Sequence, residues 1–342
     1  MRYKHIVIPT VGGPENLNLV EDELPEPRAN EVRIKVLAAG VSFADILMRK
    51  GVHPESWNLA RTPFTPGWDV VGIVDKLGDG VSKWQTGQMV AALPIVGGYA
   101  EYIILQSNEP VPVPSRLDHA EAVSLILNYT TAYQMLHRCA HIKPGEVILI
   151  NGGAAGGVGT ALLQLGKIAN LKRMYGTVSY EKHDIVFGLG GTPIDYKSVD
   201  LVQEITKATR YDDGDNTESG VDAVFDGIGG KSLKSSYEML RGGGRLVAYG
   251  GTPTADLGDW LMMFTLNLVP DKREFMLYSI QTLKRLKPDW FHEDLISLLN
   301  LLEQGKLKPI VAAKMPLNQA AQAHELLASG SVTGKIVLIC ND

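Results

Sequence analysis

The sequence predicts an α/β protein that combines a doubly wound parallel sheet with a second, β-rich domain. Residues 147–169 form an apolar run, a glycine-rich turn and an amphipathic stretch in succession, which predicts strand, turn and helix. From there to residue 250, strand-like runs alternate with helical ones, a pattern typical of a parallel sheet. Residues 1–125 instead contain short strands separated by glycine turns, which predicts a barrel-like or sandwich-like domain.

The glycine-rich turn has the composition of a dinucleotide-binding site. Residues 154–159 follow the pattern A-x-G-x-x-G, with alanine in place of the usual first glycine. Small residues let a pyrophosphate approach the backbone, and the helix that follows directs free N–H groups and the positive end of its dipole at the phosphates. We therefore expect Ala155, Gly156, Gly157 and Val158 to bind a nucleotide cofactor. The alternative is a glycine-rich loop that binds nothing.

The β-rich part has its own sequence of elements. Its strand-like runs lie at 31–39, 70–78, 88–93 and 99–105. Between the first two, the pattern predicts a short helix over 42–50 that is closed by Gly51. A longer helical segment covers 118–140, and Asp118 is in the position of its N-terminal cap.

The remaining elements follow in order along the chain. Further strands are predicted at 173–178, 192–196, 221–226, 245–250 and 335–339. Helices are predicted after Gly159, near Ser179, from Leu201, over 233–240, over 294–304 and near 320–327, and the segment 307–311 is extended. The acidic stretch 211–220 predicts a surface loop.

Composition limits the possible functions. A length of 342 residues fits two domains, and a net charge of −5 provides no electrostatic attraction to nucleic acid or to an anionic membrane. The N-terminus has no apolar signal region, and no window has the length of a membrane span. Cys139 and Cys340 are too few for a disulfide framework or a cysteine-rich zinc site. We expect a cytoplasmic protein that acts on a small molecule, with no nucleic-acid or membrane partner.

Six stretches of the chain resemble the zinc-free quinone oxidoreductase branch of the medium-chain dehydrogenase/reductase superfamily. They are AGVSFADILMRKG at 39–51, PGWDVVG at 66–72, NYTTAY at 128–133, AAGGVG at 154–159, GKLKP at 305–309 and TGKIVL at 333–338. Within this branch, the chain is also similar to the vesicle-amine-transport-1-like reductases. The resemblance covers nearly the whole chain.

This resemblance implies a split architecture. A GroES-like catalytic domain would comprise residues 1–125 and 306–342, and a Rossmann NADP-binding domain would occupy residues 126–305 between them. The active-site cleft of the family lies between the two domains. Homodimers are common in the branch, and they often pair the two Rossmann sheets at their edges.

The resemblance also implies chemistry without a metal. Zinc-binding relatives carry a cysteine where Ser42 stands and Gly-His-Glu where Gly67, Trp68 and Asp69 stand. A catalytic zinc needs about three thiolate, imidazole or carboxylate ligands, which these positions do not supply. Without a Lewis acid, we expect hydride transfer to a substrate already polarised by conjugation, such as an enone or a quinone.

The region after the second Rossmann strand indicates the choice of cofactor. An NAD-specific site usually places an acidic residue there, whereas this strand ends at the uncharged Val178 and Ser179. In the resembled branch, Ser-x-x-Lys followed by a tyrosine after the third strand holds the 2′-phosphate of NADPH. Ser179, Lys182 and Tyr196 match that pattern, so we expect NADPH. If Glu181 faces the ribose instead, NADH would be preferred. The other cofactor-binding positions implied are Asn128, Thr131, Gly227, Gly250 and Gly251.

The substrate pocket is expected to contain Ser42, Asp45, His53 and Tyr129. Quinone oxidoreductases often have asparagine at the first position, and tyrosines where Leu47 and His53 stand. His53 is either a proton donor or an exposed loop histidine. Asp45 either orients the nicotinamide side of the pocket or is a polar surface residue. No catalytic acid is therefore assigned.

Two other functions remain open at this point. One is an enoyl reductase that acts on acyl thioesters, which would need a long channel. The other is a nucleotide-binding protein with a structural or sensing role and negligible turnover.

Overall fold

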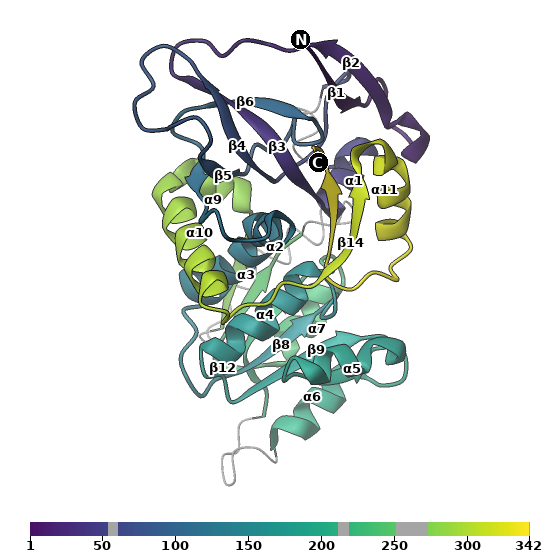
Figure 1. Cartoon of the computed structure of the whole chain (residues 1–342). Coiled ribbons are helices and arrows are strands. Elements are labelled where there is room, and N and C mark those ends of the chain that lie inside the picture. The colour runs from purple at the N-terminus through teal and green to yellow at the C-terminus, as the bar shows by residue number, and fades with distance from the viewer. Residues whose placement is uncertain (54–60, 211–218, 251–272, 342) are drawn as a thin grey trace. The chain divides into compact units, whose positions relative to one another are not determined.

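The computed structural model describes residues 1–53, 61–210, 219–250 and 273–341 (Figure 1). The chain divides into two compact units. The first unit is Met1–Thr130 together with Asp289–Asp342, and the second is Thr131–Pro288. The expected domain division placed residues 126–305 in the nucleotide-binding domain, whereas residues 126–130 and 289–305 belong to the first unit. Residues 289–303 are part of helix α10 (Pro288–Glu303), which is bonded to other residues of this unit through Arg116–Glu303 at 2.9 Å and His292–Asn108 at 3.1 Å.

The second unit is a six-stranded parallel sheet in the order β10-β9-β8-β11-β12-β13. Its strands are β8 (Val147–Asn151), β9 (Arg173–Val178), β10 (Thr192–Asp195), β11 (Val221–Asp226), β12 (Leu240–Ala248) and β13 (Glu274–Leu277). This order reverses between β8 and β11, as it does in dinucleotide-binding folds, and ligands bind at such a reversal outside the carboxyl ends of the strands. Every residue of β8 and β11 is buried, because helices cover both faces of the sheet.

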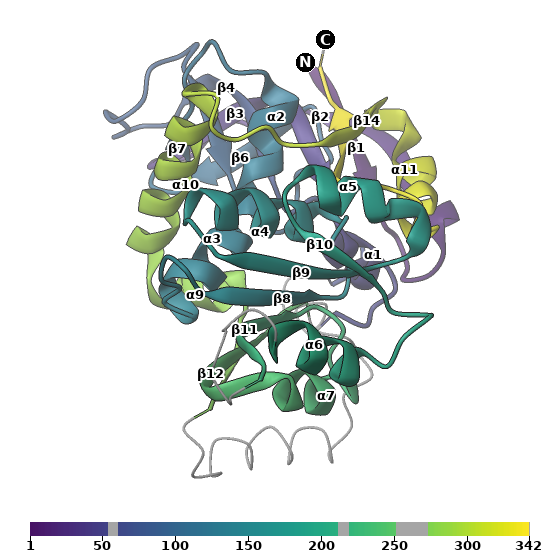
Figure 2. The same cartoon turned by 90° about the horizontal axis from the view of Figure 1, so that it is seen from below.

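Helices flank this sheet on its two faces. They include α4 (Gly157–Ile168), α5 (His183–Gly188), α6 (Leu201–Arg210) and α7 (Ser232–Glu238), with α9 (Ile280–Leu286) near the end of the unit. Figure 2 shows α4 and α5 on one face of the sheet, and α6 and α7 on the other. Side chains of α6 and α7 pack on the sheet in one apolar cluster that includes Leu149, Val224, Ile205 and Leu233.

The first unit contains a seven-stranded mixed sheet and a separate two-stranded sheet. The larger sheet runs β14-β15-β3-β4-β5-β7, and β6 also pairs with β3. Its strands are β3 (Glu31–Val41), β4 (Val70–Leu77), β5 (Met89–Ala92), β6 (Tyr102–Gln106), β7 (Val111–Pro112), β14 (Val311–Pro316) and β15 (Lys335–Ile339). The smaller sheet pairs β1 (Arg2–Val7) with β2 (Asn18–Glu23).

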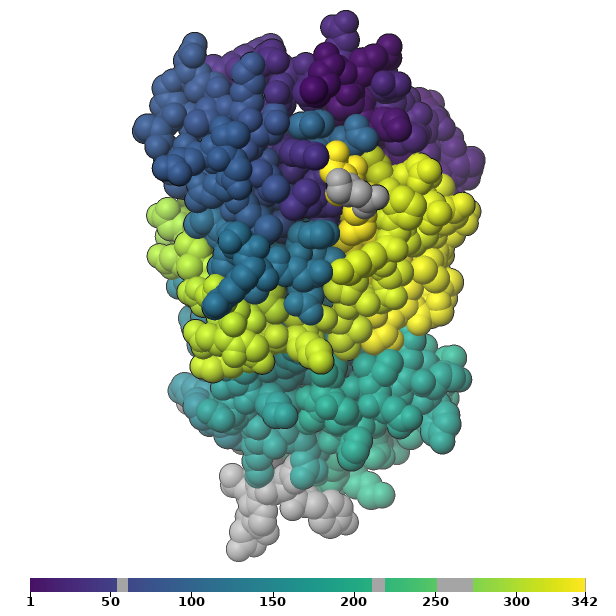
Figure 3. All heavy atoms as spheres, in the orientation of Figure 1, coloured from purple at the N-terminus to yellow at the C-terminus, as the bar shows by residue number. Residues whose placement is uncertain are grey.

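The two ends of the sequence meet in this sheet. Strand β15 pairs antiparallel with β3, so Ile336 lies opposite Val41 and Leu338 opposite Ala39. Figure 3 shows the last residues of the chain, in yellow, against N-terminal segments of the same unit. The described helices of the unit include α1 (Phe43–Arg49), α2 (His119–Ser124), α10 and α11 (Ala320–Ala328), and its short turns include η1 (Pro14–Asn16) and η6 (Leu317–Gln319).

The predicted fold class is confirmed: one unit is β-rich and the other has a doubly wound parallel sheet. Two predicted segments need correction. Strand β12 begins at Leu240 rather than at residue 245, so the glycines at 242–244 lie inside it. Helix α10 begins at Pro288 rather than at residue 294. In both, the element extends past its local sequence pattern. Among the described helices, none is long and apolar enough to cross a bilayer.

Candidate nucleotide-binding and substrate sites

The glycine turn after β8 is held in place by the end of β9. Gly152 and Gly153 have φ values of +90° and +72°, in the left-handed region that glycine occupies without steric cost. The N–H of Gly152 donates to Thr177 Oγ1 at 2.7 Å, and the N–H of Ala154 donates to the Thr177 carbonyl at 3.4 Å. One residue of β9 thus orients the whole turn.

Helix α4 packs directly on this turn because its third residue is glycine. A Cβ on Gly159 would lie 2.3 Å from the Gly153 carbonyl oxygen and 2.5 Å from Ala154 Cα, so no larger residue fits. The alanine in place of the first motif glycine is also accommodated. Ala154 is fully buried, and its Cβ fills the space beside Gly176, where another Cβ would come within 2.7 Å of it.

The start of α4 has the properties of an anion-binding site. Gly156 is the N-cap and offers no side-chain acceptor to the first N–H groups of the helix, which have no partner within a helix. A Cβ added to Gly153 would meet nothing within 4 Å, so the turn is open on that side. Gly157 and Val158 are half-buried, whereas the side chain of Ala155 is buried. The turn therefore suits a phosphate that contacts backbone rather than side chains.

A buried polar network lies under the carboxyl ends of β8 and β11. Asn151 Nδ2 donates to Ser232 Oγ at 3.0 Å and to Ser236 Oγ at 2.9 Å, and it lies 3.3 Å from Asp226 Oδ2. Asp226 Oδ2 also accepts from Ser236 Oγ at 2.6 Å and from Ser232 Oγ at 2.8 Å. The sequence analysis missed this network; the only local signal was a polar residue at the end of each of two apolar strands.

Asp226 also shapes the loop that follows β11. Its Oδ1 accepts from the N–H groups of Ile228 and Gly229, each at 2.8 Å. This fold of the loop brings Ile228 against the glycine turn, since a Cβ on Gly152 would lie 2.6 Å from Ile228 Cγ1. The network therefore positions two sides of the candidate cofactor site at once.

The predicted residues Gly227 and Gly250 lie next to this turn. A Cβ on Gly227 would lie 3.0 Å from the Tyr249 hydroxyl and 3.4 Å from the Gly152 carbonyl oxygen, and one on Gly250 would lie 3.8 Å from the Gly227 carbonyl oxygen. Burial and the nearby charge of Asp226 raise the Tyr249 pKa well above its usual value, so this phenol stays neutral. Gly251 lies outside the described residues.

The residues expected to bind the 2′-phosphate follow neighbouring strands. Val178 at the end of β9 pairs with Asp195 at the end of β10, so Ser179 and Tyr196 leave the same edge of the sheet. Tyr196 is 55% exposed, and Lys182 is half-buried at the end of the turn η5 (Tyr180–Lys182), where burial lowers its pKa. The structure thus brings Ser179 and Tyr196 to the edge where the glycine turn lies.

Glu181 shares this region. Hydrogen bonds from its own backbone N–H and from the Ser179 hydroxyl lower the pKa of Glu181, aided by the charges of Lys197 and His183. The Ser179 hydroxyl is therefore partly engaged by an ionised carboxylate.

Asn128, Tyr129 and Thr131 lie in one continuous helical stretch that contains two π-helical turns. The first turn is η3 (Leu125–Tyr129) and the second is η4 (Met135–Cys139), with α3 (Thr130–Gln134) between them. All three side chains are buried. Wide turns of this kind are frequent at functional sites because they redirect side chains. Asn128 and Tyr129 belong to the first unit and Thr131 to the second.

In the first unit, Ser42 and Asp45 form a reciprocal cap at the start of α1. The N–H of Asp45 donates to Ser42 Oγ at 3.2 Å, and the N–H of Ser42 donates to Asp45 Oδ2 at 2.9 Å. The two side-chain oxygens, Ser42 Oγ and Asp45 Oδ2, are 2.5 Å apart. The short helix closed by Gly51, which has φ +73°, is confirmed.

Asp45 is not a surface residue, so that alternative is wrong. It is fully buried, because the chain folds back over α1 and the N–H of Gly67 donates to Asp45 Oδ1 at 3.0 Å. Burial raises the pKa of Asp45 to about 7; the bonds from Ser42 oppose this shift, and the charge of Asp69 adds to it. A carboxyl group of this kind is poised to exchange a proton near neutral pH.

Two further buried side chains, Tyr99 and His324, extend this polar cluster from Asp45, and the sequence analysis did not identify them as site residues. The Tyr99 hydroxyl lies 3.1 Å from His324 Nε2, and burial together with the charges of Asp45 and Asp69 raises the Tyr99 pKa. Burial and the charge of Arg49 lower the pKa of His324 to about 3, so this imidazole is neutral. Tyr99 and His324 are both far from Asp45 in sequence, which is why no local pattern indicated them.

His53 is half-buried rather than an exposed loop residue. Its ring lies 5.3 Å from the ring of Trp68 in an edge-to-face arrangement. Trp68 Nε1 donates to Met48 Sδ at 3.0 Å. The position held by histidine in zinc-binding relatives therefore carries a buried indole that packs on α1. Among the described residues, no group of three or more His, Cys, Asp or Glu side chains is arranged to hold a metal ion.

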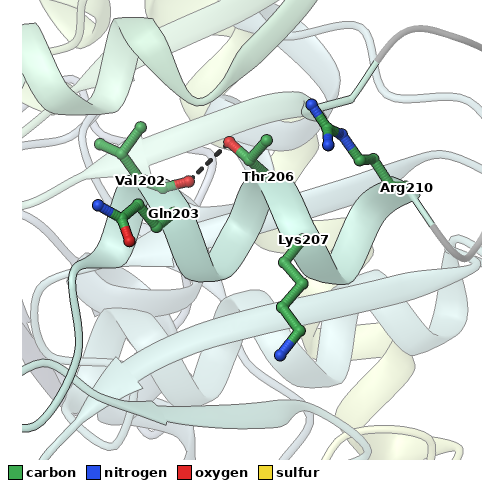
Figure 4. A pocket seen from close by; sticks show the side chains of 5 residues that line it. All are labelled: Val202, Gln203, Thr206, Lys207 and Arg210. Carbon is green, nitrogen blue, oxygen red and sulfur yellow. Dashed lines mark hydrogen bonds between the residues drawn. The ribbon is translucent and has the colours of Figure 1, made fainter.

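A surface hollow elsewhere on the second unit takes no part in these sites. It is lined by Val202, Gln203, Thr206, Lys207 and Arg210, all from α6 (Figure 4). Thr206 Oγ1 donates back to the Val202 carbonyl at 2.7 Å, so its polar group is satisfied within the helix. None of the predicted site residues lines this hollow.

Comparisons with known proteins agree with this architecture. Residues 28–115 match the alcohol dehydrogenase GroES-like domain, and residues 190–338 match a family described as zinc-binding dehydrogenase. Rat quinone oxidoreductase is 31% identical over 333 residues, which cover 96% of this chain and 95% of the relative. The chain belongs to the quinone oxidoreductase branch of the medium-chain dehydrogenase/reductase superfamily. Its members are oxidoreductases, and so is this chain.

Other members of the superfamily are similar over nearly the whole chain. A zebrafish synaptic vesicle membrane protein VAT-1 homolog is 29% identical, covering 98% of this chain and 70% of the relative. Among solved structures, Escherichia coli quinone oxidoreductase complexed with NADPH matches with a TM-score of 0.86 and 28% identity, covering 98% of this chain and 99% of the other. CurK enoyl reductase also matches with a TM-score of 0.86, at 27% identity, and with the same coverage. Both a quinone reductase and an enoyl reductase therefore share this fold.

Proposed function

We propose that this oxidoreductase uses NADPH to reduce an activated double bond or a quinone, and that it needs no metal. The observation that carries this proposal is the geometry at one edge of the parallel sheet. The open glycine turn at 152–157 adjoins the end of β9, and Ser179 and Tyr196 leave the same edge. The similarity to a quinone oxidoreductase complexed with NADPH supports the same cofactor.

The residues around this turn fit the phosphates of that cofactor. Gly157 and Val158 would bind the pyrophosphate through backbone N–H groups. Gly156 would line the site without a side chain, because its own N–H donates to the Gly153 carbonyl at 2.7 Å. Ser179, Lys182 and Tyr196 would bind the 2′-phosphate. We assign the remaining cofactor contacts to Asn128, Thr131, Ala155, Gly227, Gly250 and Gly251. Because Ala155 is buried, any contact it makes is through its backbone.

Metal independence rests on the two positions that hold ligands in zinc-binding relatives. Ser42 is a poor zinc ligand, and its hydroxyl is already paired with Asp45 at 2.5 Å. Trp68 offers no lone pair, and its N–H is bonded to Met48. The reduced nicotinamide supplies the hydride when bound. The substrate must therefore carry its own polarisation, as a conjugated carbonyl does, while the protein positions it and donates hydrogen bonds.

Binding calorimetry with NADPH and NADH tests the cofactor assignment. In the variant Lys182→Ala, we expect NADPH affinity to fall about tenfold or more, because a charge-assisted bond to the phosphate is worth about 1.5–3 kcal/mol. NADH affinity should not change. Lys207→Ala is the matched control, since it removes the same charge from the exposed face of α6. An unchanged NADPH affinity in the Lys182 variant would count against this assignment.

An enoyl-thioester reductase is the second candidate, favoured by the similarity to CurK enoyl reductase. A panel of quinones, short enones and enoyl thioesters separates the candidates when NADPH oxidation is followed by absorbance. Faster turnover of enoyl thioesters than of quinones and enones would favour the second candidate. Tight NADPH binding with no turnover of any of them would favour a nucleotide-binding protein without catalytic function.

We also propose that the protein is a cytoplasmic homodimer with a small-molecule substrate and with no membrane or nucleic-acid partner. Strand β13 ends the described sheet, and Leu277 on it is 55% exposed, which suits pairing between two sheets. Light scattering on the purified protein tests the dimer. Leu277→Lys should shift a dimer toward monomer, because it would place a charge in the apolar contact.

A further inference from the structure

The cap at the start of α1 brings the hydroxyl group of Ser42 into hydrogen-bond contact with the carboxyl group of Asp45. Ser42 Oγ accepts a bond from the N–H of Asp45 and lies 2.5 Å from Asp45 Oδ2. An oxygen–oxygen separation of this length is typical of a hydrogen bond in which one partner is ionised. Ser42 supplies the hydrogen of this bond while Asp45 is ionised, and Asp45 can supply it once its carboxyl group has taken up a proton.

The direction of the serine hydroxyl depends on which oxygen holds that hydrogen. When Asp45 is ionised, Ser42 Oγ–H donates to Oδ2. When Asp45 is protonated on Oδ2, its O–H donates to Ser42 Oγ, which then accepts two bonds, including that from the Asp45 N–H. A hydroxyl oxygen has two acceptor positions, so the hydrogen of Ser42 must then point away from Asp45. Protonation of the buried acid thus turns Ser42 into an outward donor.

The described side chains around Asp45 differ in how far solvent reaches them. Asp45 is fully buried, and so are the groups that face it from other elements: Tyr99, Asp69, Lys335 and the N–H of Gly67. Of the side chains around this carboxyl group, Ser42 is the most exposed, at 7%. A proton that enters or leaves the carboxyl group therefore passes most directly through the serine hydroxyl.

We propose that Ser42 and Asp45 form a proton relay, in which Ser42 protonates the reduced substrate and Asp45 resupplies Ser42. This inference rests on the proposed function, because Ser42 must face the substrate. Ser42 would be the catalytic residue, and Asp45, which acts through it, a positioning residue and proton store.

The protons and electrons of the step balance. Hydride addition to a conjugated carbonyl compound supplies two electrons and one hydrogen and leaves an enolate, which needs one proton. Ser42 Oγ–H gives its proton to the enolate as Asp45 Oδ2–H gives its own to Ser42 Oγ. The serine hydroxyl is restored and Asp45 is left as a carboxylate. After product release, Asp45 regains a proton from water along the same path.

A purely structural cap is the rival explanation, and two substitutions separate it from a relay. Ser42→Gly removes the hydroxyl but retains most of the capping free energy, because glycine at an N-cap costs only a few tenths of a kcal/mol relative to serine. Ser42→Thr keeps both the hydroxyl and the cap. A cap alone predicts near wild-type rates in both variants, whereas a relay predicts a difference between them.

The first measurement is the pH profile of kcat/KM with NADPH and an enone. The wild type and Ser42→Thr should lose activity as pH rises through neutrality, since Asp45 then carries no proton to supply. In Ser42→Gly, activity below neutrality should fall at least tenfold and this pH dependence should disappear. The relay would be overturned if Ser42→Gly retained the wild-type profile, or if Ser42→Thr lost it as well.

The second measurement needs no turnover. Infrared difference spectra of the protein alone should show the C=O stretch of a buried carboxylic acid that disappears as pH rises through neutrality. The band should be absent in Asp45→Asn, and its midpoint should shift in Ser42→Gly but not in Ser42→Thr. Turnover without such a band would overturn the relay alone. A titrating band without turnover of any acceptor would overturn the proposed function, and with it the catalytic use of this pair.

Discussion

Lys335 Nζ lies 2.9 Å from Asp69 Oδ2 and 3.3 Å from Asp69 Oδ1, and both side chains are sealed from solvent. This ion pair connects β15, near the C-terminus, to the segment before β4. Gly40 on β3 makes room for it, since a Cβ there would lie 2.3 Å from Lys335 Cε and 2.4 Å from Asp69 Oδ1. The sheet shared by the two ends of the chain is thus joined by a buried charge pair as well as by backbone pairing.

Removing one partner of this pair should destabilise the protein strongly. We expect Lys335→Met to lower the free energy of unfolding by about 3–5 kcal/mol, because it leaves a buried carboxylate without its counter-charge. Urea denaturation followed by tryptophan fluorescence measures this. The control is Lys314→Met, which breaks the exposed 3.0 Å pair with Asp118 and should cost less than about 1 kcal/mol. Equal losses in the two variants would show that burial is not the cause.

The close packing of α4 on the glycine turn makes Gly159 the most sensitive position in the motif. Gly159→Ala places a methyl group 2.3 Å from a backbone oxygen, so the turn must move and nucleotide affinity should fall by at least tenfold. Calorimetry with NADPH measures this loss. Gly188→Ala, at the end of α5, is the control, because an added Cβ meets nothing within 4 Å there. If the two variants bind NADPH equally, the turn does not form the site.

The Asn151–Asp226 network should couple stability to nucleotide binding. Ser236→Ala removes the 2.6 Å donor to Asp226 and the 2.9 Å acceptor of Asn151, and leaves both groups buried. We expect a loss of about 1–3 kcal/mol in unfolding free energy together with weaker NADPH binding. Ser297→Ala, which removes only an exposed bond to a helix carbonyl, should change neither by more than about 0.5 kcal/mol. Loss of stability with full NADPH affinity would contradict the positioning role.

Asp45 and His324 should make opposite contributions to the pH dependence of stability. The pKa of Asp45 is raised to about 7, so its folded-state proton stabilises the protein at low pH and this stability is lost as pH rises from about 4 to 7. The pKa of His324 is lowered to about 3, so the neutral ring stabilises the protein above about 6.5, and this stability is lost as pH falls toward 3. Between about pH 4 and 6.5, the contribution of Asp45 to the unfolding free energy therefore falls with rising pH, whereas the contribution of His324 rises.

Single variants should reveal the contribution of each residue to the pH dependence of the unfolding free energy. Relative to wild type, the unfolding free energy of Asp45→Asn should gain a positive dependence on pH in this window, and that of His324→Leu a negative one. Each can reach about 1.4 kcal/mol per pH unit, the value for one proton. Urea titrations between pH 4.5 and 6.5 measure both. Differences from wild type that do not vary with pH would mean that neither group is shifted.

Much of this protein was predictable from local patterns in the sequence. The strands at 173–178, 221–226 and 335–339 occupy the predicted residues, because runs of five or six residues between turn signals have the length of a strand and are too short for a typical helix. The glycine turn was predictable because a run of small residues between a strand and a helix is typical of a dinucleotide-binding turn. The position of Ser42 at the start of a short helix was also predicted from its neighbours.

Only the tertiary structure decided the environment of each polar side chain. The sequence around Asp45 does not show whether this residue is exposed or buried. It is buried because the segments that contain Gly67 and Tyr99 pack against it. Lys335 and Asp69 are 266 positions apart, and Asn151 and Asp226 are 75 apart, so no periodic pattern connects them. The spacing of apolar residues along the chain is a local property that can be read directly from the sequence. Burial, pKa and ion pairing depend on which distant segments meet, and that is determined only when the chain folds.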